Sequence, residues 1–488
     1  MTDLAPAAPN ERIEAIDTIR GLALLGILII NILAFGLPLR AVFDPTVDGS
    51  TTGIDFAAYF AMGFVFEGAM RGLFSMLFGA GIAMLAASGK GAAVHYRRQL
   101  LLLGIGLIDA FVLLWTGDIL VPYALAGMVL YFARNWRPRG LFIAAGFVFA
   151  YLVIVYSAFF GILTVLPEQA EAVQVRLDAG ESVSADERAM LDGWRELEVN
   201  IEPTPRLLER ERLKFQGTYW QSVEANAEEV IGLYAFALPY FIIWDAIACM
   251  LLGMALYKVG FLTGQRSQRF YLATAILGFG VGLAVNGFEM AMKIATDYAD
   301  EWVSGASVPT NDLGRVCMAL GFVSAVMIAT ARGYLAKLRR GLAAVGRMAL
   351  SNYILQSIFG IVIFHDMGFG LWNDLDRHQL YYVVFGQWAV MIAFSVWWLN
   401  RYRFGPLEWV WRTLTYGRWQ PMALVGSTGR DKPVPYGSRS NDAGPDKPAC
   451  EGGMNNAGRD KPACEGGTNA ERDKPVPCEG GTNDAGQA

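Results

Sequence analysis

Residues 19–38 read IRGLALLGILIINILAFGLP, a run in which Arg20 is the only charged side chain. A helix rises about 1.5 Å per residue and the hydrocarbon core of a bilayer is about 30 Å thick, so about twenty apolar residues can cross it. No basic region of the kind found in cleaved signal peptides precedes the run. We therefore predict that it is a retained membrane-spanning helix.

Nine further apolar runs follow along the chain. They lie near Arg71–Ala87, Gln99–Thr116, Ile119–Ala133, Leu141–Leu166, Leu233–Val259, Phe270–Met290, Val316–Thr330, Ala349–Phe364 and Leu380–Leu399. Each is expected to be a helix, because open backbone groups cannot be satisfied in lipid. The composition agrees, since 54% of the 488 residues are hydrophobic and only 17% are charged. We predict an all-α, polytopic transmembrane bundle of ten spans.

The stretch Ile54–Phe66 leaves eleven spans open as an alternative. It is apolar, but it is too short for a full crossing and Glu67 follows it at once. If it crossed, the N-terminus would lie outside. If it is a half-helix or the tilted start of the next span, the clusters of Lys and Arg place both termini in the cytoplasm of a bacterial inner membrane. We favour the second interpretation.

The chain divides by composition into two membrane halves, residues 1–166 and 232–422, an insertion at 167–231 and a tail at 423–488. The insertion is predicted to be helical and periplasmic, either a solvated cap without chemistry or a lid over a substrate entrance. The tail repeats Asp-Lys-Pro and has almost no apolar residues, which predicts disorder. The net charge of −5 argues against nucleic acid as a partner, and the scattered histidines and unpaired tail cysteines argue against a metal site.

Ionisable residues in a bilayer core cost about 2.5–3.5 kcal/mol, so each one needs a reason. On the cytoplasmic side, Asp17 and Arg20 share a helix face and can pair as an interfacial anchor. Alternatively, Arg20 and Arg347 hold an anionic ligand. Asn352 and Gln356 lie beyond Arg347 on the ninth span.

A second polar group is expected on the periplasmic side. Asp109 is the most anomalous residue, because it lies in the middle of LLLLGIGLIDAFVLLW with no basic residue nearby. Such a carboxylate suits a general base or a proton carrier, with a structural hydrogen bond or a pair with Arg71 as the alternative. Glu67 and Arg71 can pair if their helix is continuous, and Asp118 is expected to cap the next helix. Asp245 and Glu289 are further intramembrane carboxylates.

Five segments carry a resemblance to a known family. They are RIEAIDTIRGLALLGILIINI (12–32), GLFSMLFGAGIAML (72–85), WTGDILVPYALAG (115–127), GRMALSNYILQS (346–357) and FGPLEWVWRTLTYGRW (404–419). Together, and in this order, they resemble the YeiB-like family of uncharacterised bacterial membrane proteins. The resemblance covers most of residues 10–422 apart from the insertion.

That family is more distantly similar to integral-membrane acyltransferases of the heparan glucosaminide N-acetyltransferase type. The resemblance implies acyl transfer from cytoplasmic acyl-CoA to an acceptor reached from the other side. It places six residues at family motif positions: Asp17, Arg20, Glu67, Asp118, Asn352 and Glu408. Many relatives carry a histidine just before GDIL where this chain has Asp109, and a lysine common near FSxLFG is absent, with Ala69 in its neighbourhood. An aspartate can act as a base, but it cannot readily carry an acyl group as an imidazole does.

The sequence therefore leaves two functions open. The first is acyl transfer to an envelope or exported acceptor, with Asp109 as base, Glu67 and Asp118 orienting the acceptor, and Arg20 and Arg347 on the CoA phosphates. The second is a proton-coupled transporter or exporter of a small molecule, in which the intramembrane carboxylates carry protons. Membrane lipids and a small-molecule or glycan acceptor are the expected partners, and a homodimer stays open.

Overall fold

The computed structural model describes residues 14–201, 205–298 and 308–423. Every element named within these ranges is a helix, and the single strand-like pairing there is an isolated bridge between Tyr402 and Ala423. The predicted all-α class is confirmed. The compact unit Met1–Val425 contains all of these helices, whereas the tail predicted to be disordered lies outside the described residues.

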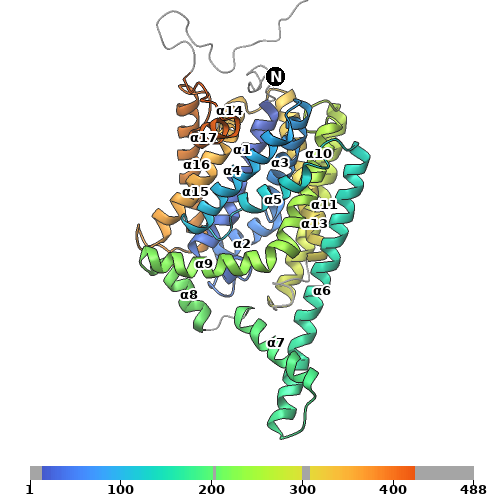
Figure 1. Cartoon of the computed structure of the whole chain (residues 1–488), viewed down its shortest axis with the longest axis vertical. Coiled ribbons are helices and arrows are strands. Elements are labelled where there is room, and N and C mark those ends of the chain that lie inside the picture. The colour runs from blue at the N-terminus through green and yellow to red at the C-terminus, as the bar shows by residue number, and fades with distance from the viewer. Residues whose placement is uncertain (1–13, 202–204, 299–307, 424–488) are drawn as a thin grey trace, which may run out of the picture. The chain divides into compact units, whose positions relative to one another are not determined.

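The helices follow one another in the order shown by the colours of Figure 1. They are α1 (Glu14–Gly36), α2 (Gly53–Val65), α3 (Ala69–Ala87), α4 (Ala92–Phe111), α5 (Leu120–Leu130), α6 (Pro138–Asp178), α7 (Ala185–Ile201), α8 (Pro205–Gln216), α9 (Tyr219–Ala235), α10 (Ile243–Lys258), α11 (Gln268–Ala295), α13 (Val308–Ala331), α14 (Ala336–Arg347), α15 (Ala349–Phe364), α16 (Arg377–Leu399) and α17 (Pro406–Tyr416). A 3₁₀ turn, η2 (Leu39–Val42), follows α1, and a π-helical turn, η3 (Leu238–Ile242), precedes α10.

The first apolar run forms α1, which is buried along most of its length and packs against α3, α14, α15 and α16. Its contact with α14 is unusually close. Gly21 lies against the backbone of Leu342, and Gly346 lies against the carbonyl of Asp17. A side chain at either glycine would push the two helices apart, so this crossing depends on both.

Seven helical segments of the described chain are long and apolar enough to cross a membrane, or eight if α14 and α15 form one broken span. The prediction was ten. Two of the predicted runs do not reach the required length of apolar helix. The first half of α4 carries His95, Arg97, Arg98 and Gln99, and α5 is only 11 residues long.

Two breaks interrupt the bundle. α2 and α3 form one candidate span of 35 residues, Gly53–Ala87, which agrees with Ile54–Phe66 as the start of the next span. The break falls at Gly68, whose φ of 68° is readily adopted only by glycine. The second break lies at Met348, where α14 and α15 meet at 84°.

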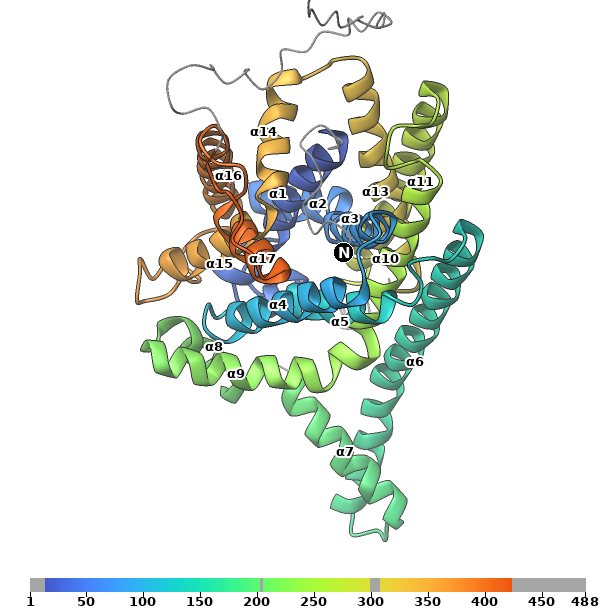
Figure 2. The same ribbon diagram turned by 45° about the horizontal axis from the view of Figure 1, so that its top comes forward.

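The ends of the bundle differ in character. The start of α1 lies at the same end as α14 and α17, and α7 and α8 lie at the opposite end (Figure 1). α6 runs without interruption through Pro167 into the insertion, so the composition boundary at residue 167 falls inside a helix. α9 returns along α4, as Figure 2 shows, and packs against it.

Candidate functional site

The loop between α4 and α5 brings two aspartates together. After α4 ends at Phe111, the chain turns back so that the amide of Trp115 bonds the carbonyl of Asp109 at 3.1 Å. Leu114 adopts a φ of 57°, which is strained for a branched residue and is the kind of backbone strain that clusters at functional sites. Gly117 lies against the Trp115 ring, where a side chain would not fit.

Asp109 is completely buried near the end of α4. Neither of its carboxylate oxygens makes a well-aligned hydrogen bond within the described residues. Its carboxyl group faces Asp118 and the hydroxyl of Ser357 on α15. The pair with Arg71 that was one interpretation of Asp109 is wrong, because Arg71 bonds another carboxylate.

Asp118 is held from two directions. Its oxygens accept the amides of Leu120 at 3.0 Å and Val121 at 2.8 Å, as expected for a carboxylate that caps the first turn of α5. The Tyr353 hydroxyl lies beside it and already accepts bonds from Trp115 Nε1 and the amide of Ile119, both at 3.1 Å. The hydroxyl proton of Tyr353 is therefore available to Asp118. We call this cluster the carboxyl-pair site; it consists of Asp109, Asp118, Tyr353 and Ser357.

The insertion covers this site. Asn226 on α9 donates to the carbonyl of Ala110 at 2.7 Å and accepts the Thr116 hydroxyl at 2.9 Å. Lys214 on α8 donates to Thr116 at 2.5 Å and pairs with Glu229 at 2.8 Å. The hairpin of α8 and α9 is thus fixed to the end of α4 by buried polar bonds, which a freely solvated cap would not need.

Aromatic packing ties the same hairpin to the end of α15. The Phe215 ring stacks on Trp372 with centroids 5.0 Å apart, and it lies 4.8 Å from the ring of His365. His365 is in the loop after α15 and is buried. Burial and the neighbouring charge of Lys214 lower the pKa of His365 to about 4. This histidine is therefore neutral at pH 7.

Arg71 belongs to a separate buried ion network. It pairs with Asp245 on α10 at 2.5 Å, and Asp245 also pairs with Arg315 on α13, which pairs with Asp312. The pair between Glu67 and Arg71, which a continuous helix would allow, does not form, because α2 ends at Val65 and Glu67 lies in the turn before α3. The sequence prediction missed Asp312 and Arg315, although they stand three residues apart just before an apolar run.

Glu67 does not join the carboxyl-pair site. It lies at the break before α3 and pairs with Lys293 of α11 at 3.8 Å. Glu289 of α11 accepts the hydroxyl of Thr310 at 2.5 Å. Of the three residues predicted to act together, the structure brings Asp109 and Asp118 together and gives Glu67 another partner.

The predicted residues at the end of the bundle where α1 begins make several kinds of contact. Asp17 and Arg20 form the expected pair at 3.1 Å. Arg347 donates to the carbonyl of Arg403 at 3.4 Å, and Gln356 donates to the carbonyl of Leu24 at 3.2 Å. Both contacts are between helices or loops of the bundle, so they also serve packing.

Two further residues at this end bond across helices. Asn352 donates to the hydroxyl of Ser395 on α16 at 2.9 Å. Glu408 of α17 accepts the amide and the hydroxyl of Ser351 at 3.0 and 2.5 Å, so it caps the start of α15. Sequence reasoning placed Glu408 only by resemblance, because its partner is 57 residues away.

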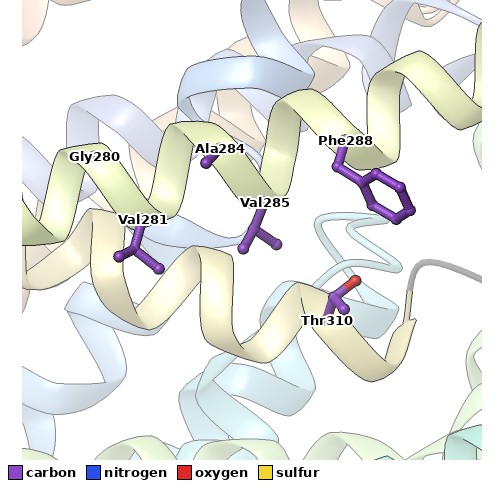
Figure 3. A pocket seen from close by; sticks show the side chains of 6 residues that line it. All are labelled: Gly280, Val281, Ala284, Val285, Phe288 and Thr310. Carbon is purple, nitrogen blue, oxygen red and sulfur yellow. The ribbon is translucent and has the colours of Figure 1, made fainter.

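A shallow groove of about 370 Å³ lies on α11 and α13, apart from the carboxyl-pair site (Figure 3). It is lined by Gly280, Val281, Ala284, Val285, Phe288 and Thr310. The lining is almost entirely apolar and contains none of the predicted site residues. This surface suits contact with hydrocarbon and carries no chemistry of its own.

The fold and the carboxyl-pair site define a multi-pass membrane protein with ionisable groups buried inside a helical bundle. The chain belongs to the YeiB-like family. It is 31% identical to "Uncharacterized protein YeiB" of Escherichia coli (strain K12) over 412 residues, which cover 83% of this chain and 96% of that protein. It is 28% identical to "Uncharacterized protein YxaH" of Bacillus subtilis (strain 168) over 439 residues, covering 87% and 99%.

A family described as "Protein of unknown function (DUF418)" matches residues 256–418. This range contains α11 to α17, and so includes Tyr353 and Ser357 of the carboxyl-pair site. No solved structure matches the chain.

Proposed function

We propose that this protein is an inner-membrane acyltransferase, with both termini in the cytoplasm, that uses acyl-CoA as donor. The acceptor is a hydroxyl or amine of an envelope or exported molecule, reached from the side of the α8–α9 hairpin. The observation that carries the proposal is the buried carboxyl-pair site beneath that hairpin. Two carboxyl groups that face each other in apolar surroundings hold one proton between them, because two negative charges repel.

In this reaction Asp109 takes the proton of the acceptor as general base. The freed lone pair of the acceptor attacks the thioester carbonyl and the carbon–sulfur bond breaks. The thiolate of CoA leaves and takes up the proton that Asp109 accepted, which restores the base. No acyl-enzyme is formed, which suits an aspartate in place of a histidine. Asp118, steadied by Tyr353 and by two backbone amides, orients the pair.

The donor enters from the opposite end. Arg20 and Arg347 contact its phosphates in this proposal, and α1 spans the distance to the carboxyl-pair site. Phe35, fifteen residues after Arg20, stacks on Trp115 with centroids 4.1 Å apart. Fifteen residues of helix measure about 22 Å, so only a long and flexible donor could reach from one end to the other.

The test uses the full-length protein in nanodiscs with radiolabelled acetyl-CoA. We expect binding and slow hydrolysis by the wild type, and a loss of turnover of about 10²- to 10⁴-fold in Asp109→Asn, the range for removal of a general base. Asp374→Asn, an exposed aspartate in the loop before α16, is the matched control and should stay active. Protein that neither binds nor hydrolyses acetyl-CoA, beside an active reference acyltransferase, would exclude this function.

Proton-coupled transport is the second candidate, and the helix breaks favour it. Discontinuous helices are common at transporter binding sites, and this bundle breaks at Gly68 and at Met348. Glu67 lies beside the first break and pairs with Lys293. Proteoliposomes with a trapped pH dye should then show proton movement that Asp109→Asn abolishes. Transport that ignores an imposed pH gradient and survives Asp109→Asn would remove this candidate.

A further inference from the structure

α17 clamps the first turns of α4 through paired backbone and side-chain contacts. The Trp411 indole donates to the carbonyl of Arg98 at 2.9 Å, and Arg97 donates to the carbonyl of Thr415 at 3.3 Å. The Arg98 guanidinium lies over the ring of Trp411, 4.2 Å from its centroid. Arg98 is therefore fixed in position by the element that packs on it.

Two other guanidinium groups act electrostatically on Arg98. Arg412 of α17 and Arg20 of α1 both repel it, and it lies one residue before the apolar run that starts at Gln99. Burial and this repulsion lower the pKa of Arg98 to about 10, so its guanidinium remains charged at pH 7. Three like charges are thus brought together at one end of the bundle, where α17 crosses α4 (Figure 2).

The carboxylates near this cluster are already engaged. Asp17 pairs with Arg20, and Glu408, which attracts Arg412, accepts two bonds from Ser351. Among the described residues, no carboxylate contacts the guanidinium of Arg98. The three arginines carry three positive charges, and the two carboxylates near them carry two negative charges. The cluster therefore has an excess of positive charge.

Two of these arginines stack on aromatic rings through their faces. The Arg412 guanidinium lies over the ring of Phe404, 4.6 Å from its centroid, much as Arg98 lies over Trp411. A guanidinium that stacks through its face still presents its N–H groups in its plane, as a rigid fork that matches two oxygens of one anion. The Tyr416 hydroxyl is close enough to interact with both arginines.

We propose that Arg20, Arg98 and Arg412 form a phosphate-binding site at this end of the bundle, with Tyr416 as a fourth polar group. Its ligand is a phosphate ester, carried either by a soluble compound or by the headgroup of an anionic lipid. A phosphate fits the number of charges and the two forks better than a single carboxylate does. In the proposed acyl transfer this site would hold the donor phosphates together with Arg347, but it does not depend on that reaction.

The test compares two sources of phosphate on the full-length protein. In the first arm, the protein in nanodiscs of phosphatidylcholine is titrated with inorganic pyrophosphate by calorimetry. In the second, retention of phosphatidylglycerol is counted by native mass spectrometry. Arg98→Gln and Arg412→Gln are compared with Arg418→Gln, which makes the same charge change at an exposed arginine just after α17.

We expect the wild type to bind one of the two probes, and Arg98→Gln and Arg412→Gln to weaken it by about 10- to 100-fold, the cost of a charge-assisted bidentate contact. Arg418→Gln should bind as the wild type. Binding in the first arm identifies a soluble ligand, and binding in the second identifies a lipid. Neither probe binding, or equal binding by all variants, would overturn the proposal.

Arg98→Lys keeps the positive charge and serves as a control for loss of binding through misfolding. It should also lose affinity, because an ammonium has no planar fork, and its melting temperature without ligand should match the wild type. Full affinity in Arg98→Lys together with full affinity in Arg98→Gln would show that Arg98 is not a ligand. If the protein binds phosphate but does not turn over acetyl-CoA, the phosphate-binding site is supported and the acyl-transfer function is excluded.

Discussion

Replacing His365 by asparagine should remove part of the acid sensitivity of the fold. The imidazole is 1% exposed, lies against Phe215 and faces the ammonium group of Lys214. Its pKa is lowered to about 4 in the folded protein from an ordinary value of 6.5. Between those values the unfolded chain binds a proton at this histidine and the folded chain does not.

The sign follows from linkage. The contribution of neutral His365 to the free energy of unfolding is fully present above pH 6.5. It is lost as the pH falls from 6.5 toward 4, because the unfolded state takes up more protons at this histidine than the folded state does. At about pH 7.5 the loss of folding stability that this histidine causes is close to zero. At about pH 5 the two pKa values give a loss of roughly 2 kcal/mol, which is a large part of a typical folding free energy.

Thermal unfolding followed by tryptophan fluorescence at about pH 7.5 and about pH 5 measures this loss. The difference between the two pH values should be smaller in His365→Asn than in the wild type by roughly 2 kcal/mol. His378→Asn is the matched control, since that histidine is only partly buried and pairs with Asp55 at 2.8 Å. An equal pH difference in wild type and His365→Asn would refute the assigned environment of His365.

Three further substitutions test the packing of the bundle through thermal stability in detergent. Asn226→Ala removes the donor to the carbonyl of Ala110 and should cost about 1–3 kcal/mol, and no change would mean that the hairpin is not docked. Asp245→Asn leaves the charges of Arg71 and Arg315 poorly compensated, so a loss of about 3–5 kcal/mol is expected, and a neutral result would contradict the network. Gly68→Ala should cost about 1–2 kcal/mol because of its positive φ, and added stability would show a continuous helix.

The fold class could be predicted because it depends on a local property. Runs such as Ile19–Pro38 are apolar over the length of a crossing, and lipid leaves them no alternative to helix. The number of crossings was harder to predict. A run of adequate hydropathy, such as Ile119–Ala133, can fold as an 11-residue helix joined to loops, and window composition does not reveal where the helix begins.

The candidate site could be predicted only in part, because its geometry depends on contacts between distant residues. Asp109 was recognisable as an isolated carboxylate, and Asp118 as a cap for the next helix. The identity of the partner of Arg71 was not recognisable, since Asp245 lies 174 residues away and a turn between α2 and α3 separates Glu67 from the helix that carries Arg71. The surroundings of Arg98 could not be predicted either, because its contacts with Trp411 join residues 313 positions apart.

The length of α6 has a consequence for the space around the membrane. Its 41 residues measure about 60 Å, whereas a bilayer core takes about 30 Å. The second half therefore rises beyond the headgroups as a stiff rod, and the turn to α7 lies well out in the aqueous compartment. A molecule that binds this tip would contact the protein far from lipid. A displacement of the rod would be transmitted to α10, against which α6 packs.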